Sequence, residues 1–223
     1  MKKEETIPRV EHQVEKEQQA TPQPKKKSVK TTQLSNIKNG WGLKKVEGAE
    51  PEIPSDAKEM LEKFNGYYMG DPNKKELFLT FDEGYENGYT AQILDVLKEN
   101  QVPACFFITG PYLETEQELV RRMVEEGHEV GNHTVNHPSM PEVKDDMELE
   151  REMLELDKKF QALTGESMQF MRPPKGEYSE RTLALTANMG YKSVFWSFAY
   201  VDWNVNQQRG AAYAHDEVMK YLH

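Results

Sequence analysis

The chain has 223 residues, of which 37% are apolar, so it is long enough to bury one substantial core. Its formal net charge is −10, and the acidic excess lies after residue 50, where 17 Lys and Arg stand against 31 Asp and Glu. This acidity excludes a nucleic-acid partner, which would need clustered Lys and Arg. No apolar run approaches the ~20 residues of a membrane span. The oligomeric state is not indicated by the sequence.

Composition divides the chain into three parts. Residues 1–38 are rich in Lys, Glu, Gln, Thr and Pro, which is typical of a disordered or linker tail. Residues 39–75 are expected to form a lead-in segment that packs on the main domain, with a helix over 55–64. No apolar core of a signal peptide follows Met1. Residues 76–223 are expected to form the main domain.

This last part alternates between strand-like and helix-like segments. We expect strands over 77–81, 103–108, 129–131, 170–172 and 191–197, and helices over 89–100, 115–126, 145–164, 179–189 and 216–221. Repeated strand–helix units with buried strands predict a parallel α/β sheet or barrel. In such folds the chemistry gathers at the carboxyl ends of the strands. Asp82, His133, Arg172 and Asp202 all follow predicted strand ends.

The first polar group is the turn Thr80-Phe81-Asp82-Glu83-Gly84-Tyr85. Two adjacent carboxylates repel each other, so one of them needs a cation, a proton or an arginine nearby. An acidic turn in water is the alternative.

A second group is His133-Thr134-Val135-Asn136-His137, which separates two imidazoles by four residues. On a helical turn these side chains would face the same way and could share a metal ion with a carboxylate. Two ordinary surface histidines are the alternative.

The third group is Arg172-Pro173-Pro174-Lys175-Gly176. Its arginine can neutralise and orient a carboxylate. Because the two prolines lack N–H donors, the next free amide belongs to Lys175. A fourth stretch ends in Asp202-Trp203. Taken alone, these two stretches are equally consistent with a surface arginine and a packing tryptophan.

Taken together and in this order, the four stretches resemble the motifs of the polysaccharide deacetylases, which are carbohydrate esterases with a NodB homology domain. The longer run from Thr80 to Tyr89 is similar to the delta-lactam-biosynthetic branch, which acts on peptidoglycan during spore cortex formation. The resemblance covers roughly residues 40–223. It implies a distorted (β/α) barrel that removes the acetyl group from an N-acetylated sugar. This de-N-acetylation is expected to lead to a muramic delta-lactam. It also implies a location outside the membrane, at the cell wall.

The resemblance further implies a divalent metal, with zinc as the expected ion. The implied metal ligands are Glu83, His133 and His137. Among the implied catalytic residues, Asp82 is the general base, and the Lys175 amide donates a hydrogen bond to the oxyanion. Arg172 is expected to orient Asp82, and Asp202 is expected to hold Arg172 in place. Trp203 and Tyr85 are expected to line the substrate groove, and the partner is expected to be a peptidoglycan glycan strand.

Two departures from the family pattern stand out. Glu83 replaces the usual aspartate, and no strand carrying the family's last Leu-x-His motif follows Leu222 and His223. We therefore expect a barrel that lacks its last strand, a truncated domain, and a general acid beyond residue 223. The leading hypothesis is a deacetylase of N-acetylmuramic acid in peptidoglycan. The alternatives are a deacetylase of N-acetylglucosamine in peptidoglycan or chitin, and a non-catalytic glycan-binding domain on a degenerate scaffold.

Overall fold

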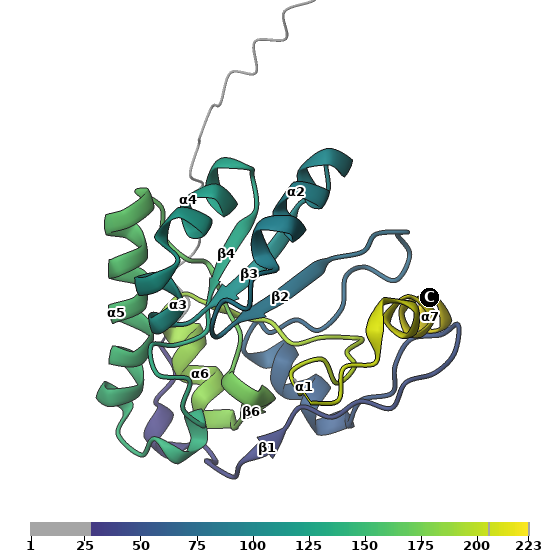
Figure 1. The fold of residues 1–223 in the computed structure, drawn as a ribbon. Helices are drawn as coiled ribbons and strands as arrows, with labels where there is room; N and C mark the ends of the chain where they lie inside the picture. The colour runs from purple at the N-terminus through teal and green to yellow at the C-terminus, as the bar shows by residue number, and fades with distance from the viewer. Residues whose placement is uncertain (1–27, 205, 223) are drawn as a thin grey trace, which may run out of the picture.

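A parallel five-stranded sheet forms the centre of the protein in the computed structural model, which describes residues 28–204 and 206–222 (Figure 1). The sheet order is β2-β3-β4-β5-β7. The strands are β2 (Leu79–Glu83), β3 (Ala104–Ile108), β4 (Glu129–Asn132), β5 (Phe170–Met171) and β7 (Lys192–Ser193). They lie side by side in chain order, so β2 and β7 are the two end strands of the described sheet.

The register aligns the carboxyl ends of these strands. Glu83 is paired with Ile108, Ile108 with Asn132, and Asn132 with Met171. The residues that follow β3, β4 and β5 therefore emerge along one edge of the sheet. This alignment brings together side chains that are about 90 positions apart in the sequence.

The helices that follow the strands are α2 (Thr90–Asn100), α3 (Gly110–Thr115), α4 (Gln117–Glu125), α5 (Asp146–Thr164), α6 (Glu180–Asn188) and α7 (Gly210–Tyr221). In Figure 1, α2, α4 and α5 flank β2–β4, and α7 lies apart from them near the carboxyl terminus. No helix in the described part of the chain is long and apolar enough to cross a membrane.

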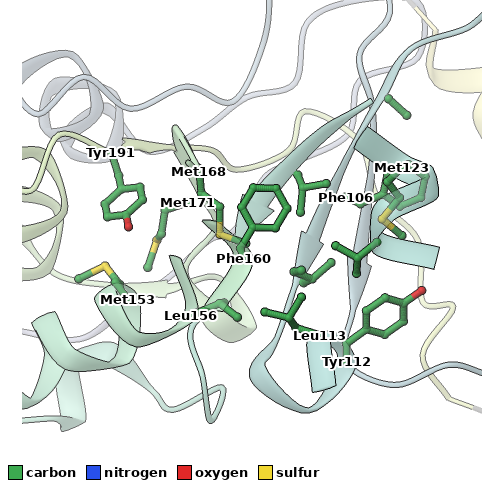
Figure 2. Close-up of a cluster of buried hydrophobic side chains, with 14 of the residues drawn as sticks. Phe106, Tyr112, Leu113, Met123, Met153, Leu156, Phe160, Met168, Met171 and Tyr191 are labelled. Carbon is green, nitrogen blue, oxygen red and sulfur yellow. The ribbon is translucent and has the colours of Figure 1, made fainter. Parts of the chain in front are cut away.

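The main core lies between the sheet and α2, α4 and α5 (Figure 2). Its buried side chains include Phe106 of β3, Met123 of α4, and Leu156 and Phe160 of α5. Each such side chain contributes about 1.5–3 kcal/mol by leaving water. Met153 and Met171 pack in the same cluster, so these methionines belong to the core.

A second buried cluster joins the lead-in segment to the domain. It contains Trp41, Leu61 and Phe64 from this segment, together with Tyr178 and Phe195. The helix α1 (Ser55–Lys63) lies here, and β1 (Asn39–Gly40) pairs antiparallel with β6 (Glu177–Tyr178). Three short 3-10 helices cover Thr31–Gln33, Met140–Glu142 and Pro174–Gly176.

The amino-terminal boundary of the packed chain differs from the expected one. Residues 1–27 of the expected tail lie outside the described residues, but residues 28–38 contact the domain. The Val29 N–H donates to Asn188 at 2.9 Å, and the Thr31 hydroxyl donates to Asp146 at 2.5 Å. Polar residues that the composition assigned to a linker are therefore ordered by hydrogen bonds to α5 and α6.

Two expected elements also differ. The helix expected over 115–126 begins two residues later, as α4, and a short helix that was not expected, α3, precedes it and ends before the non-helical backbone of Glu116. The first strand begins at Leu79, and both Leu77 and Phe78 are exposed. The expectation that this strand is buried was wrong because β2 lies at the end of the sheet, with a neighbour on one side only in the described chain.

Candidate functional site

Asp82 and Arg172 form an ion pair at the carboxyl edge of the sheet. Asp82 is the fourth residue of β2, and Arg172 comes directly after β5. The Arg172 Nη1 donates to Oδ1 of Asp82 at 2.6 Å. The arginine is buried, whereas 40% of the Asp82 side chain is exposed. The structure thus brings these two predicted residues together, with the carboxylate open to an incoming molecule.

Further bonds fix the guanidinium of Arg172. Its Nε donates to the Val194 carbonyl at 3.1 Å, and its Nη2 donates to the Thr80 hydroxyl at 2.8 Å and to the Phe195 carbonyl at 3.2 Å. Asp202 is not among its partners within the described residues. Thr80 belongs to the first motif, but no role for it was predicted. Its position two residues before Asp82 on the same strand face was the available signal.

The two predicted histidines also meet at this edge. His133 follows β4, and its ring centroid lies 4.8 Å from that of His137. The His133 Nδ1 is bonded to the Arg172 carbonyl at 2.8 Å, which leaves Nε2 facing Oδ2 of Asp82 at 3.8 Å. His133, Asp82 and Arg172 are therefore one connected group.

The backbone between the histidines is a loop and not the expected helical turn. Thr134 and His137 have positive φ angles of 65° and 54°. Residues other than glycine rarely adopt this conformation, and where they do the surrounding structure must hold them in it. Here the His137 N–H donates to the Thr134 hydroxyl at 3.0 Å.

Glu152 of α5 anchors this loop, although no pattern in the sequence pointed to this residue. Its carboxylate accepts from both the N–H and the side-chain amide of Asn136, at 2.8 and 2.7 Å. Its main-chain carbonyl accepts from the Val135 N–H at 3.0 Å. The buried Asn132 adds a bond to the Thr134 N–H at 2.9 Å.

Burial controls the protonation of the two imidazoles. It lowers the pKa of His133 to about 4, against an opposing contribution from the Asp82 charge. Burial also lowers the pKa of His137, and the Lys175 charge acts in the same direction. Both rings are therefore neutral at pH 7, which leaves nitrogen lone pairs available to a metal ion.

Glu83 is placed apart from this group. Successive side chains of a strand point to opposite faces, so Glu83 faces away from the side on which Asp82 meets Arg172. Burial raises the pKa of Glu83 to about 7, and the charges of Glu86 and Asp82 add to this, while the Thr90 side chain opposes it. The structure therefore brings Glu83 together with Glu86 and Thr90, and not with the histidines.

The donor set fits a metal ion only in part. Among residues 28–204 and 206–222, no group of three or more His, Cys, Asp or Glu side chains is placed to hold one ion. The neutral pair of His133 and His137 has the chemistry of a zinc or similar divalent site. The third ligand that the resemblance implies, Glu83, is not in position.

The remaining predicted residues surround this group at the surface. An open pocket of about 380 Å³ is lined by His137 and Tyr85 together with Gly84, Thr109, Pro111, Val135 and Asn136. Lys175 has a positive φ of 61° in the turn after Arg172. Asp202 and Trp203 are exposed. Partial desolvation raises the pKa of Asp202, and the charge of Asp82 adds to the effect.

Comparison with known proteins identifies the family of this site. The model of the polysaccharide deacetylase family matches residues 69–194, which include Asp82, His133, His137 and Arg172. The chain belongs to the polysaccharide deacetylase family. The predicted family is thus confirmed, although the stretch that ends in Asp202-Trp203 lies outside the matched residues.

Related sequences and structures agree with this assignment. The chain is 48% identical to an uncharacterized 30.6 kDa protein of Geobacillus stearothermophilus, over 85% of this chain and 72% of that protein. It is 39% identical to the peptidoglycan-N-acetylmuramic acid deacetylase PdaA of Bacillus subtilis, over 82% of this chain and 70% of PdaA. The PdaA structure, described as a family 4 carbohydrate esterase, matches with a TM-score of 0.83 over 85% of this chain and 82% of that one. A family 4 carbohydrate esterase from Bacillus anthracis, 44% identical, matches with a TM-score of 0.70 over 76% of this chain and 78% of that one.

Proposed function

We propose that this protein hydrolyses the acetamide of N-acetylmuramic acid residues in peptidoglycan. The observation that carries the proposal is the connected group of Asp82, Arg172, His133 and His137 at one edge of the sheet. The 39% identity to PdaA, whose name gives N-acetylmuramic acid in peptidoglycan as its substrate, supports this choice of sugar. In a strand that carries no stem peptide, the free amine would condense with the lactyl carboxyl of the same muramic acid, with loss of water, to form a delta-lactam of the spore cortex type.

Asp82 is proposed as the general base. Its Oδ1 is held by Arg172, so Oδ2 is the oxygen free to accept a proton from the attacking water. Arg172 keeps this carboxylate oriented, because its remaining donors are tied to Val194, Thr80 and Phe195. Attack of the water on the acetamide carbon, followed by cleavage of the C–N bond, releases acetate and the sugar amine.

His133 and His137 are proposed to hold a divalent metal, expected to be zinc. When bound, such an ion supplies Lewis acidity toward the acetamide carbonyl. The amide of Lys175, in the turn beside His137, is proposed as a hydrogen-bond donor to the developing oxyanion. Tyr85 and Trp203, which are 64% and 72% exposed, are proposed to contact the sugar rings of the glycan strand.

The proposal extends to the domain and its location. We propose that residues 76–223 form the catalytic domain, as a distorted (β/α) barrel that is open between β2 and β7 in the described residues, and that residues 39–75 pack on it as the lead-in segment. The substrate lies in the cell wall, so we propose that the protein acts outside the membrane. Asp202 is proposed to have a supporting role beside Asp82, because partial desolvation, and after it the charge of Asp82, raise its pKa.

Acetate release tests this function and separates it from its alternatives. The zinc-loaded protein is incubated with purified peptidoglycan strands, with the same strands stripped of their stem peptides, and with chitin oligomers. Acetate from the stripped strands, with the new amine on muramic acid, is the expected result, because the delta-lactam needs a free lactyl carboxyl. Acetate released only from the intact, peptide-bearing strands would contradict this function. Release of amine on glucosamine would identify an N-acetylglucosamine deacetylase. Glycan binding without acetate release from any substrate would identify a non-catalytic domain. The observation that favours this alternative is the position of Glu83 apart from the two histidines.

A further inference from the structure

Trp41, in the lead-in segment, is bonded to both chain segments that surround Arg172. Its main-chain N–H donates to the Gly176 carbonyl at 2.7 Å. Its indole Nε1 donates to the Trp196 carbonyl at 2.9 Å. One residue therefore connects the turn that follows Arg172 with the segment that follows β7.

The segment after β7 supplies much of the environment of the Arg172 guanidinium. The carbonyls of Val194 and Phe195 accept from its Nε and Nη2. The ring of Trp196 lies 5.6 Å from the guanidinium carbon, with the Phe107 ring at 4.3 Å. A displacement of residues 194–196 would move these acceptors, and with them the donor that holds Asp82.

The turn after Arg172 is packed directly against Trp41. Lys175 and Gly176 have φ angles of 61° and 65°. A Cβ atom at Gly176 would lie 2.8 Å from the Trp196 ring and 3.0 Å from Cβ of Trp41. Because this spacing leaves no room for a side chain, the turn cannot shift toward either tryptophan. Lys175 at its tip is close enough to lower the pKa of His137, after the larger effect of burial.

Trp41 is itself held rigidly. Its side chain is buried, and its ring stacks on Phe195 with centroids 4.5 Å apart and an interplanar angle of 26°. The preceding residues Asn39 and Gly40 pair with Tyr178 and Glu177. Because Trp41 is fixed on these sides, a change at Trp41 would displace both the turn after Arg172 and residues 194–196.

We infer that Trp41 is a positioning residue for the reaction centre, acting through Gly176 and Trp196 on the Lys175 amide and the Arg172 guanidinium. The kinetic part of this inference rests on the proposed function. The lead-in segment is then part of the catalytic architecture, although it lies outside the residues matched by the family model.

A conservative variant separates positioning from simple core packing. Trp41→Phe keeps an aromatic ring against Phe195 but removes the Nε1 donor to Trp196 together with part of the buried ring volume. Phe160→Leu is the matched control, because Phe160 is equally buried but belongs to the main core. Both variants should lower the thermal unfolding midpoint. Only Trp41→Phe should also change the hydrogen bonds and surroundings of the Arg172 side chain.

The decisive readout is the Arg172 Nε–H resonance in ¹H–¹⁵N spectra, assigned by its loss in Arg172→Lys. In Trp41→Phe we expect this resonance to shift and its hydrogen exchange to accelerate about tenfold. We also expect kcat for acetate release to fall about tenfold with KM within about twofold. In Phe160→Leu the resonance and kcat should stay as in the wild type.

An unchanged Arg172 resonance in Trp41→Phe, or an equal change in Phe160→Leu, would overturn the inference. If Trp41→Phe does not fold, Gly176→Ala disturbs the same turn from its other side and should give the same resonance change. The spectrum does not depend on activity. Absence of acetate from the wild type would therefore overturn the proposed function and leave the positioning of Arg172 to be decided by the resonance.

Discussion

Arg172 binds one oxygen of Asp82 and leaves the other free. Its Nη1 lies 2.6 Å from Oδ1, while Oδ2 faces Nε2 of His133 at 3.8 Å. A charge-assisted bond of this kind fixes the carboxylate in one orientation. The free oxygen is then directed toward the imidazole pair, where a substrate acetamide would have to lie.

This asymmetry predicts the effect of Asp82→Asn. The amide oxygen of asparagine can still accept from Arg172, but the side chain cannot take a proton from water. We expect kcat for acetate release to fall about 10²–10⁴-fold. Loss of the charged acceptor should lower the free energy of unfolding by about 1–2 kcal/mol. Both quantities are measured on one preparation, by acetate assay and by urea unfolding.

Asp202→Asn is the control for this variant. Asp202 lies near Asp82 but is exposed and is not bonded to Arg172 in the described chain. We expect a loss of less than about tenfold in kcat. A loss as large as that of Asp82→Asn would show that Asp202 belongs to the reacting group, and equal activity of Asp82→Asn and wild type would exclude Asp82 as the base.

A second prediction concerns the metal ligands. His133→Ala and His137→Ala should each weaken zinc binding at least about 100-fold, since each removes one of two neutral imidazoles. Glu83→Gln should change the affinity by less than about threefold, because Glu83 lies with Glu86 and Thr90. Isothermal titration with zinc measures all three without any activity assay. A loss in Glu83→Gln that matches the histidine variants would place Glu83 among the ligands.

The sequence was sufficient to predict which residues gather at the site. In a parallel sheet the carboxyl ends of the strands share one edge, so polar residues at positions 82, 133 and 172 must come close together. Asp82, His133 and Arg172 met this condition and are in contact. This part of the prediction depended only on strand order and direction.

The sequence could not show how each side chain is held. Strand alternation separates Glu83 from Asp82, but adjacent carboxylates in one motif suggested a shared site. The positive φ angles at Thr134 and His137 have no propensity signal, since both residue types usually avoid that region. Trp41 contacts the site through main-chain carbonyls, and a carbonyl carries no sequence signature.

The anchor of the histidine loop gives a third prediction. Glu152→Ala removes the acceptor for both N–H groups of Asn136, so the loop that positions His137 keeps only the main-chain bond from Val135 to residue 152. We expect zinc affinity to fall about 10–100-fold, the usual size of effects transmitted through groups that orient a ligand.

Glu155→Ala provides the comparison on the same helix. Glu155 is exposed, and the change removes a charge of the same sign only one turn away. We expect its zinc affinity to equal that of the wild type. Equal affinities in the two variants would show that the loop keeps its conformation without Glu152.

The last prediction concerns His128, a buried residue away from the site. Its Nδ1 accepts from the Ala104 N–H at 3.2 Å, so the ring proton is on Nε2, for which the described residues provide no acceptor. A second proton would have to enter at Nδ1 and break the bond to Ala104. Burial accordingly lowers the pKa of His128 below its ordinary value of 6.5, with the Glu126 charge opposing and the Arg122 charge assisting this shift.

Below pH 6.5 the unfolded chain therefore binds more protons at this position than the folded chain, and stability must fall as the pH decreases. His128→Asn keeps an acceptor for Ala104 but does not titrate. Between pH 7.5 and 5, we expect the free energy of unfolding of the wild type to fall by about 1 kcal/mol more than that of the variant. Urea unfolding at several pH values measures the difference, and His215→Asn, on the exposed surface of α7, controls for the loss of a histidine. Parallel pH dependence of wild type and His128→Asn would show that the folded protein accommodates the protonated ring.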